Sequence, residues 1–333
     1  MSARISEAID RICLLGGARE SARANDLATL YLAARRRAAA PLSASAARRL
    51  EAAIRPGATA VILTGAGGLP SLPRGETDGP LGAAVLARGL VQTLGAKPVL
   101  VADARFRGPI VAALDALADG SRATPWRRSV RFVTFPGSRG SAESAAKTLW
   151  ESLRPAAVIA VERLGPNRRG VIHNARGEDV TATHAKVEAL FSLARVNRVL
   201  TIGVGDRGNE LGFGSIKVPP SSNAAVHRQC ACPCRSSIAC AVPADLVVVA
   251  SVSNWGAYAI VAGLAIRFGD LRLLHRPDDE IRMLKACVTA GARDGISWKG
   301  RLTVDGLPGG IHRTVVLLLQ EAIARGIGAG HDP

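Results

Sequence analysis

The sequence predicts an α/β fold: a mostly parallel sheet with helices on both faces, in a Rossmann-like three-layer arrangement that carries an N-terminal helical extension. Three observations lead to this prediction. Beyond residue 56, short apolar runs alternate with stretches of helical periodicity, which is the pattern of βαβ units. Two of the runs end in glycine-rich turns, where open α/β sheets place ligands. The stretch 254–268 is almost entirely apolar and predicts a buried helix.

Residues 1–55 form the predicted N-terminal helical segment. Apolar residues recur at helical spacing from Ile5 to Cys13, and Ser43 is suited to cap a further helix that ends near Ile54. We expect this segment to pack on the main α/β domain.

The main domain is expected to cover residues 56–327, with a loose tail after it. The length of 333 residues allows one large domain or two moderate ones. An irregular, cysteine-rich loop is expected at 217–240. The expected strands cover 60–63, 98–102, 130–134, 157–161, 199–202 and 246–250, and the expected helices cover 80–94, 110–117, 141–153, 183–194 and 254–268.

The chain is strongly basic, with a net charge of +16. The excess is arginine that is dispersed along the chain, and the longest basic run covers only residues 35–37. The sequence has no basic motif studded with aromatic residues, so we do not expect nucleic acid as a partner. The charge fits attraction of small anionic substrates.

The sequence gives no sign of a membrane protein. No apolar run approaches the ~20 residues of a membrane-spanning helix. Glu7 and Asp10 lie near the start, and the apolar stretch of a signal peptide is missing there. We therefore expect a cytoplasmic protein, and the sequence leaves a homo-oligomer open.

The glycine-rich stretch 203–214 is the strongest candidate for a site. It follows the apolar run 199–202 and carries two carboxylates and an amide, on Asp206, Glu210 and Asn209. Glycines let the backbone turn tightly and approach a ligand closely. We expect this turn to bind a ligand at the end of a strand.

A second glycine-rich turn follows the first expected strand. Backbone N–H groups around Thr64, Gly65 and Gly67 are suited to hold a carboxylate or phosphate, and a tight βα turn explains them equally well. The turn lacks both the GxGxxG spacing and the Walker lysine, so we expect no nucleotide cofactor.

Polar residues at other strand and helix ends complete the candidate site. Glu76, Thr77 and Asp78 precede the expected helix at Pro80. Asp78 is also suited to cap that helix. Burial would bring the pKa of Glu76 toward the range of a general base. Glu162 ends a buried strand. Its position fits either a catalytic acid or one half of a surface ion pair. Three further candidates for contacts with substrate are Asn174, Arg176 and Asn254.

Three cysteines alternate in the stretch Cys230, Cys232 and Cys234. In a cytosolic chain such a cluster favours metal or thiol chemistry over disulfides. The spacing differs from that of common structural zinc sites. Two interpretations remain open: the cysteines bind zinc or iron with His227 as a fourth ligand, or they form a loop of free thiols.

Several motifs occur in an order that resembles the D-glutamate cyclase-like C-terminal domain family. The resemblance covers residues 57–320. Arg207 stands where the family pattern has glycine, and the cysteine-rich loop has no counterpart that we can place. The motifs are 76–83 (ETDGPLGA), 161–163 (VER), 173–177 (HNARG), 203–214, 252–256 (VSNWG) and 303–308 (TVDGLP).

The resemblance implies a hydro-lyase that converts D-glutamate to 5-oxo-D-proline and water, with manganese associated with activity. A small dicarboxylate or amino acid is then the expected substrate. Asp206 and Glu210 would bind Mn²⁺ or Mg²⁺ or serve as acid and base, because hard oxygen ligands suit these ions. The acid and base roles would be shared with Glu76, Asp78 and Glu162.

Two other functions remain open. One is a different lyase, hydrolase or isomerase that acts on a small amino or hydroxy acid with the same scaffold. The other is a non-enzymatic metal- or ligand-binding module that uses the loop 230–240.

Overall fold

A single parallel sheet forms the centre of the protein. The computed structural model describes residues 3–16, 21–121, 123–218, 227 and 229–328. The strand order β3-β2-β1-β4-β5-β6 has its switch in winding direction between β1 and β4. The predicted Rossmann-like α/β fold is confirmed. The strands are β1 (Thr59–Thr64), β2 (Lys97–Ala102), β3 (Arg131–Thr134), β4 (Ala157–Val161), β5 (Leu200–Gly205) and β6 (Leu246–Val249).

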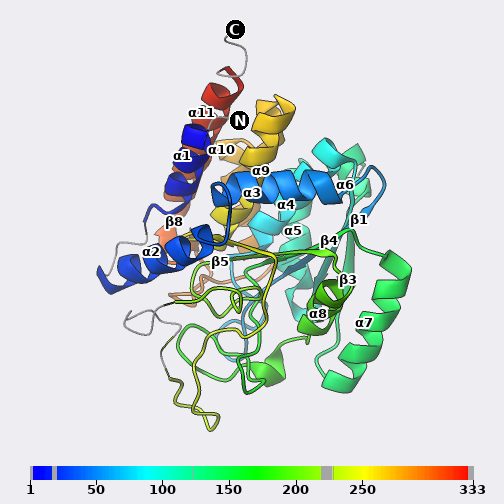
Figure 1. Ribbon diagram of the computed structural model, residues 1–333, viewed down its shortest axis with the longest axis vertical. Coiled ribbons are helices and arrows are strands. Elements are labelled where there is room, and N and C mark those ends of the chain that lie inside the picture. Colours follow the sequence, from blue (N-terminus) through cyan, green and yellow to red (C-terminus); the bar gives the residue numbers. More distant parts are fainter. Residues whose placement is uncertain (1–2, 17–20, 122, 219–226, 228, 329–333) are drawn as a thin grey trace.

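Helices cover both faces of this sheet. Figure 1 shows α3, α4 and α9 together above the strands, and α7 and α8 below and to the right of them. α4 packs on β1, β2 and α9, whereas α8 packs on β4 and β5. The helices of this main part are α4 (Pro80–Leu94), α5 (Arg107–Leu117), α6 (Pro125–Arg128), α7 (Arg139–Leu153), α8 (Glu188–Val196), α9 (Ser253–Phe268), α10 (Pro277–Thr289) and α11 (Gly309–Gly328).

The N-terminal stretch is helical, as predicted, but Ser43 is not an N-cap. The helices are α1 (Ala3–Cys13), α2 (Ser21–Arg35) and α3 (Leu42–Ala53). Ser43 lies inside the first turn of α3, and the backbone N–H groups of Leu42 and Ser43 donate to the buried Asp10 carboxylate at 2.6 and 3.0 Å. A side chain from α1 therefore caps α3, and the hydroxyl of Tyr31 in α2 donates to the same carboxylate at 3.0 Å.

The three N-terminal helices contribute to the same hydrophobic core as the sheet. Ile9, Leu30 and Leu50 are buried in one continuous cluster with β1 and β4. α1 packs on α9 and α11, and α3 packs on α9. The division into residues 1–55 and 56–327 stays a prediction, and we propose that the two parts form one body through this shared core.

Two local predictions need correction. β5 continues through Gly203 and Gly205, so the turn that was expected from residue 203 begins only at Asp206. The helix that was expected from residue 183 begins at Glu188, after a short 3-10 turn. Both errors come from predicting structure from residue type alone. Glycine is common in turns, and threonine is tolerated in helices.

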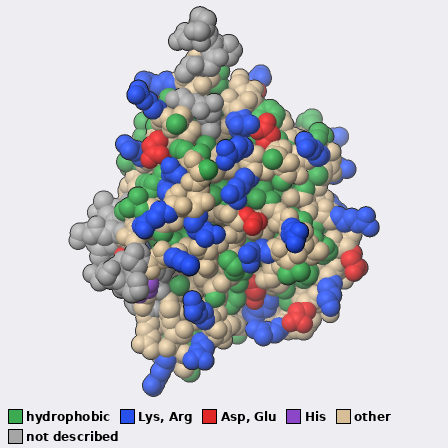
Figure 2. Space-filling model, viewed as in Figure 1, with side chains coloured by type: hydrophobic (Ala, Val, Ile, Leu, Met, Phe, Trp, Pro, Cys, Tyr) green, Lys and Arg blue, Asp and Glu red, His purple; other side chains and the backbone are tan. Residues whose placement is uncertain are grey.

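The cysteine-rich stretch has no α-helix or named strand among its described residues, which are 217–218, 227 and 229–240. The rest of the expected loop, 219–226 and 228, lies outside the described residues. The expected loose tail is likewise undescribed after Gly328. The described helices include none with the length and apolar character needed to cross a membrane. Figure 2 shows Lys and Arg side chains scattered over one face of the molecule, in keeping with the dispersed positive charge.

Candidate functional site

Five carboxylates predicted from the sequence gather near the carboxyl edge of the sheet. β1 and β4 pair there, from Ala60 with Ala157 to Thr64 with Val161, so loops that follow both strands meet at the switch point. Glu162 follows β4 directly, and its pKa responds to the four other carboxylates. We call this group the acidic cluster: Glu76, Asp78, Glu162, Asp206 and Glu210.

Glu162, Asp206 and Glu210 form the compact part of the acidic cluster. One oxygen from each carboxylate lies within 4.8 Å of the other two. Glu162 and Glu210 are buried, and Asp206 is half-buried. Ser253, at the start of α9, donates its hydroxyl to Glu162 Oε2 at 2.5 Å. Three acidic oxygens at this separation are suited to bind a divalent cation.

Glu210 is held by the backbone of its own turn. Its Oε1 accepts from the N–H groups of Asp206 and Arg207 at 3.0 and 2.9 Å, and its Oε2 accepts from Gly208 N–H at 2.7 Å. A β-carbon on Gly205 would lie 2.6 Å from Glu210 Cδ. The glycine at the end of β5 therefore leaves room for this carboxylate to fold back against the strand.

Asp78 and Asn254 join the N-termini of α4 and α9. Asp78 accepts from the backbone N–H groups of Ser253 and Asn254, each at 2.8 Å. In return, Asn254 Oδ1 accepts from Gly79 and Gly82 N–H at 2.9 and 2.7 Å. Asp78 and Asn254 therefore hold the N-termini of α4 and α9 together beside the site.

Two residues outside the predicted site join the acidic cluster. Arg207 Nε lies 3.2 Å from Asp206 Oδ2, and its terminal nitrogen lies 3.5 Å from Asp305 Oδ2. Asp305 sits in the turn between β7 (Thr303–Val304) and β8 (Leu307–Pro308). Asp305 belongs to the TVDGLP motif, but its carboxylate was not predicted as part of the site.

Three carboxyl groups of the acidic cluster have raised pKa values, those of Glu76, Asp78 and Glu162. Burial, followed by repulsion from Asp206 and Glu210, raises the pKa of Glu162 well above its usual range. Burial and repulsion from Asp305 raise the pKa of Glu76 in the same way, while Arg207 opposes that shift. Burial also raises the pKa of Asp78, against the effect of the N–H donors of α9. Raised carboxyl pKa values are typical of groups that exchange protons near neutral pH.

The glycine-rich turn after β1 packs tightly against its neighbours. Arg163, fully buried, donates to Gly65 O at 2.7 Å and to Asp103 Oδ2 at 2.6 Å. A β-carbon on Gly67 would lie 2.8 Å from Gly75 Cα, so this part of the turn is a close backbone contact. Thr64 Oγ1 is buried and has no hydrogen-bond partner among the described residues. Thr64 is thus the residue of this turn best suited to contact a ligand.

The other predicted contact residues lie in different surroundings. The Thr77 hydroxyl donates to Thr303 O at 2.9 Å. Arg176 is exposed, and its guanidinium stacks 3.6 Å from the centre of the Trp298 ring. Asn174 accepts from Arg176 and Glu178 N–H, within its own turn. Their roles toward a substrate stay predictions.

Asn209 lies next to the acidic cluster and is buried. Its Nδ2 donates to His173 O at 2.9 Å. Its Oδ1 has no hydrogen-bond partner within the described part of the chain. Asn209 therefore keeps one acceptor atom for a ligand.

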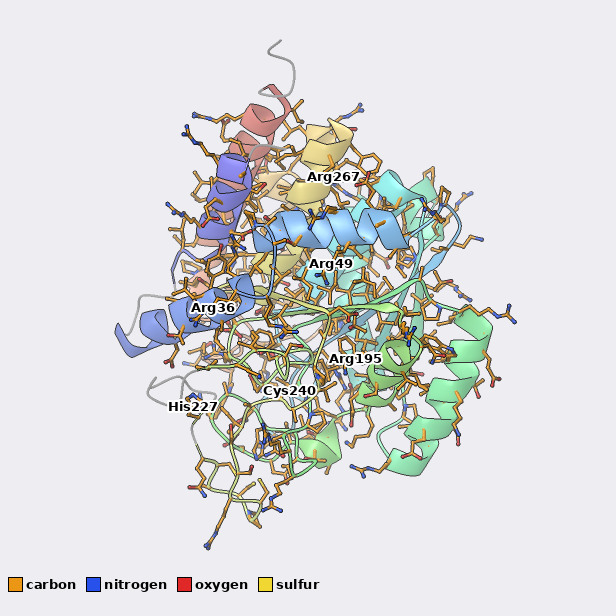
Figure 3. The ribbon with its side chains drawn as sticks, in the orientation of Figure 1. Arg36, Arg49, Arg195, His227, Cys240 and Arg267 are labelled. Carbon is orange, nitrogen blue, oxygen red and sulfur yellow. The ribbon has the colours of Figure 1, made fainter. Side chains whose placement is uncertain are left out.

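A second candidate metal group lies in the cysteine-rich loop. The sulfurs of Cys230, Cys232 and Cys234 and the ring of His173 have ligand atoms within 4.8 Å of one another. The fourth member is His173 and not His227, which is exposed. Figure 3 shows His227 at the outer edge of this region, apart from Cys240. The imidazole of His173 was noted in the sequence, but no local spacing links it to the cysteines.

Two surface cavities lie away from both groups. One, of about 430 Å³, lies among α4, α10 and the turn that follows α9, and its lining includes Arg88 and Asp279. The other, of about 540 Å³, lies at the amino end of β5, next to Arg49 and Arg198. Neither is lined by a residue of the acidic cluster.

Comparisons with known proteins point to one family. The family model described as D-glutamate cyclase-like, C-terminal, matches residues 22–320 of the chain. The mitochondrial D-glutamate cyclase of Homo sapiens is 31% identical over 282 residues, and the match covers 75% of this chain and 43% of that enzyme. The chain therefore spans less than half the length of this curated relative.

A solved structure gives a weaker likeness. The terminal R domain from the myxalamid PKS-NRPS biosynthetic pathway has 16% sequence identity and a TM-score of 0.28, over 67% of this chain and 53% of that chain. A likeness at this TM-score carries no argument about the protein.

Proposed function

The chain belongs to the D-glutamate cyclase-like, C-terminal family, and on that premise we propose that it is a lyase that closes D-glutamate to 5-oxo-D-proline and releases water. The observation that carries the proposal is the convergence of Glu162, Asp206 and Glu210 within 4.8 Å at the switch point of the sheet. The reaction needs proton transfer and neutralisation of a carboxylate, and this cluster supplies groups for both.

The reaction moves two protons from nitrogen to oxygen. A C–N bond forms between the α-nitrogen and the γ-carbon, and one C–O bond of the γ-carboxylate breaks. The ammonium group loses two protons, and the departing oxygen gains two protons and leaves as water. The reaction therefore needs a base near the nitrogen and an acid near the oxygen.

Glu76 and Glu162 are the proposed base and acid. Their raised pKa values favour the protonated form of the acid and make the ionised form of the base a stronger base. Glu162 is the more buried of the two, and a hydroxyl donor, Ser253, faces it. We assign the acid to Glu162 and the base to the half-buried Glu76.

The compact carboxylates fit Mn²⁺ or Mg²⁺. Their donor set consists of acidic oxygens, which these ions prefer, and the backbone contacts of Glu210 fix one ligand in place. Asp206 and Glu210 would hold the ion, while Glu162 beside them would carry the proton that the reaction needs. When bound, the ion would withdraw charge from the γ-carboxylate of the substrate.

The residues around the acidic cluster bind and orient the substrate in this proposal. Thr64 Oγ1 and Asn209 Oδ1 are buried polar atoms with no hydrogen-bond partner among the described residues, so each has bonding capacity left for a ligand. Asn254 and Asp78 hold α4 and α9 in position. The exposed guanidinium of Arg176 is the proposed clamp for the α-carboxylate, released from Trp298 on binding.

The test compares purified Glu162→Gln and Asp206→Asn with the unchanged protein. We expect formation of 5-oxo-D-proline from D-glutamate, with Mn²⁺ present, to fall by about 10²–10⁴ in each variant. Asp206→Asn should also weaken Mn²⁺ binding measured by calorimetry. The matched control is Asp278→Asn, which alters an exposed ion pair with Arg313. Unchanged turnover and Mn²⁺ binding in both variants would exclude this assignment.

Arg207 supports a second candidate function. This cation lies beside Asp206 and Asp305, where the family pattern has glycine, so the site differs in charge from that pattern. The alternative is a lyase, hydrolase or isomerase that acts on another small amino or hydroxy acid. A panel of D- and L-amino acids and hydroxy acids, analysed by mass spectrometry, separates the two: turnover of another acid with none of D-glutamate would favour the alternative.

A further inference from the structure

We propose that His173, Cys230, Cys232 and Cys234 bind one Zn²⁺ ion in a closed structural site. The proposal is independent of the cyclisation reaction, because it rests on a different group of side chains. Zinc in structural sites takes four tetrahedral ligands from Cys and His, and this group offers three sulfurs and one ring nitrogen.

The distances between the ligand atoms fit a tetrahedron. Cys230 Sγ lies 3.2 Å from Cys232 Sγ and 3.3 Å from Cys234 Sγ. His173 Nε2 lies 3.3 Å from Cys232 Sγ and 3.6 Å from Cys234 Sγ. With Zn–S of about 2.3 Å and Zn–N of about 2.0 Å, the edges of a regular site would be roughly 3.5–3.8 Å. A small outward shift of the sulfurs therefore accommodates the ion.

Alternatives to a metal explain the group less well. All three thiols are free in the structure, and a disulfide between any two would leave the third sulfur beside it. Three thiols and an imidazole drawn to one point gain little from weak S–H hydrogen bonds. Four protein ligands also leave no open position for a substrate, which favours a structural over a catalytic ion.

The surroundings of the ligands resemble the outer contacts of a metal site. Asn167 Nδ2 lies 3.6 Å from Cys234 Sγ and donates to Ser237 O at 2.9 Å. Cys230 N–H donates to Ser236 O at 2.9 Å, which closes the loop around the sulfurs. Such outer contacts orient metal ligands and are part of the site.

The proposed zinc joins two loops from different parts of the chain that are also linked by hydrogen bonds, such as the one from Ala241 N–H to Pro166 O at 2.8 Å. His173 comes from the loop between β4 and α8, whereas the cysteines come from the connection between β5 and β6, which has no α-helix among its described residues. His173 O accepts from Asn209 Nδ2, and Cys240 N–H donates to Gly208 O at 2.9 Å. The ion therefore holds the loop that backs the turn of Glu210.

Metal analysis of the purified full-length chain tests the proposal. After expression in zinc-supplemented medium, we expect about one zinc per chain, and loss of that zinc in Cys232→Ser and in His173→Ala. Cys240→Ser is the matched control: it changes a buried thiol of the same loop whose sulfur accepts from Val242 N–H and lies outside the group. This control should keep its zinc.

A second measurement covers variants that fail to fold. Stepwise reaction of the unchanged protein with a mercurial reagent should release zinc, detected by a chromogenic chelator, as about three thiols react. Replacement by Co²⁺ should give the visible absorption of a tetrahedral thiolate site. Absence of zinc after reconstitution, iron in its place, or equal zinc loss in Cys240→Ser and Cys232→Ser would overturn the proposal.

Discussion

Asp78 and Asn254 cap each other's helices. Asp78, just before α4, accepts from the first two N–H groups of α9, and Asn254, in the first turn of α9, accepts from Gly79 and Gly82 N–H at the start of α4. Both side chains are buried. The pair fixes the two helices that support the acidic cluster and places Ser253 against Glu162.

Removal of one cap should destabilise the fold. In Asn254→Ala, the buried N–H group of Gly82 loses its acceptor and that of Gly79 keeps only Asp78 Oδ1 at 3.0 Å, so we expect the free energy of unfolding to fall by about 1–3 kcal/mol. Urea denaturation measures this change. Asn197→Ala, at an exposed asparagine that donates to Leu193 O, is the control and should lose less than about 0.5 kcal/mol. A loss of equal size in both variants would show that the cap adds nothing.

A methyl group at Gly205 should disturb the metal ligands. The added β-carbon would lie 2.6 Å from both Glu210 Cδ and Phe213 Cε2, so Gly205→Ala must displace the carboxylate. We expect Mn²⁺ affinity to fall by at least about tenfold. Gly140→Ala, in α7 with no atom near the new carbon, is the control. Equal affinity in the two variants would contradict the proposed role of Glu210.

The buried ion pair of Arg163 and Asp103 should contribute more to the free energy of unfolding than surface ion pairs do. The pair is 2.6 Å long, and Arg163 is fully buried at the carboxyl edge of the sheet. Arg163→Ala leaves the buried carboxylate of Asp103 without its cation and should cost about 3–5 kcal/mol in chemical denaturation. Arg313→Ala removes an exposed pair with Asp278 and should cost less than about 1 kcal/mol. A small cost at Arg163 would mean that water reaches Asp103.

His184 should make stability fall in mild acid. Burial, and then the charge of Arg163, lower the pKa of His184 from 6.5 to about 4. The unfolded chain binds a proton on this side chain below pH 6.5, whereas the folded chain does so only below about 4. The stabilisation is therefore present above pH 6.5 and is lost as the pH falls from 6.5 to 4.

Urea denaturation at pH 7.5 and 5.0 measures this effect by comparison with His184→Gln. The unchanged protein should lose up to about 2 kcal/mol more than the variant between these pH values. Parallel losses in both proteins would show that His184 takes up its proton in the folded state.

Removal of the cation from the acidic cluster should strengthen metal binding. Arg207 lies 3.2 Å from Asp206 Oδ2 and repels a divalent ion there. We expect Arg207→Gly to raise Mn²⁺ affinity by at least about tenfold in calorimetry at low salt. Arg55→Gly, at an exposed residue before β1, should leave the affinity unchanged. A weaker affinity in Arg207→Gly would mean that the guanidinium instead orders the carboxylates.

Most strands were predictable because they are short buried runs; β3 is the exception, with Arg131 and Thr134 exposed. β4 was predicted with its bounds, and β1, β2 and β6 to within about a residue at each end. The acidic cluster was also predictable, since its members follow strands or precede helices whose ends meet at one edge of the sheet. These features depend on local sequence and on the general rules for parallel sheets.

Features that depend on distant contacts were not predictable. Gly203 was assigned to a turn, but it lies in β5, paired with Ala160 and Val247. A β-carbon there would lie 2.3 Å from Leu211 O, so the close approach of a later turn, and not a turn at this position, calls for glycine. Ser43 looked like a cap, but Asp10 from another helix provides it. His173 lies 59 residues from Cys232 in the sequence, so only the folded chain shows them together.

The exchange of caps between α4 and α9 also bears on the synthesis of the chain. Asn254 is 175 residues beyond Gly79, so the start of α4 leaves the ribosome long before its acceptor is made. Until then, the N–H group of Gly82 at the start of α4 lacks the acceptor that it has in the folded chain. We therefore expect the emerging chain to remain open to proteases until α9 is complete, and the sheet to close in one late, cooperative step.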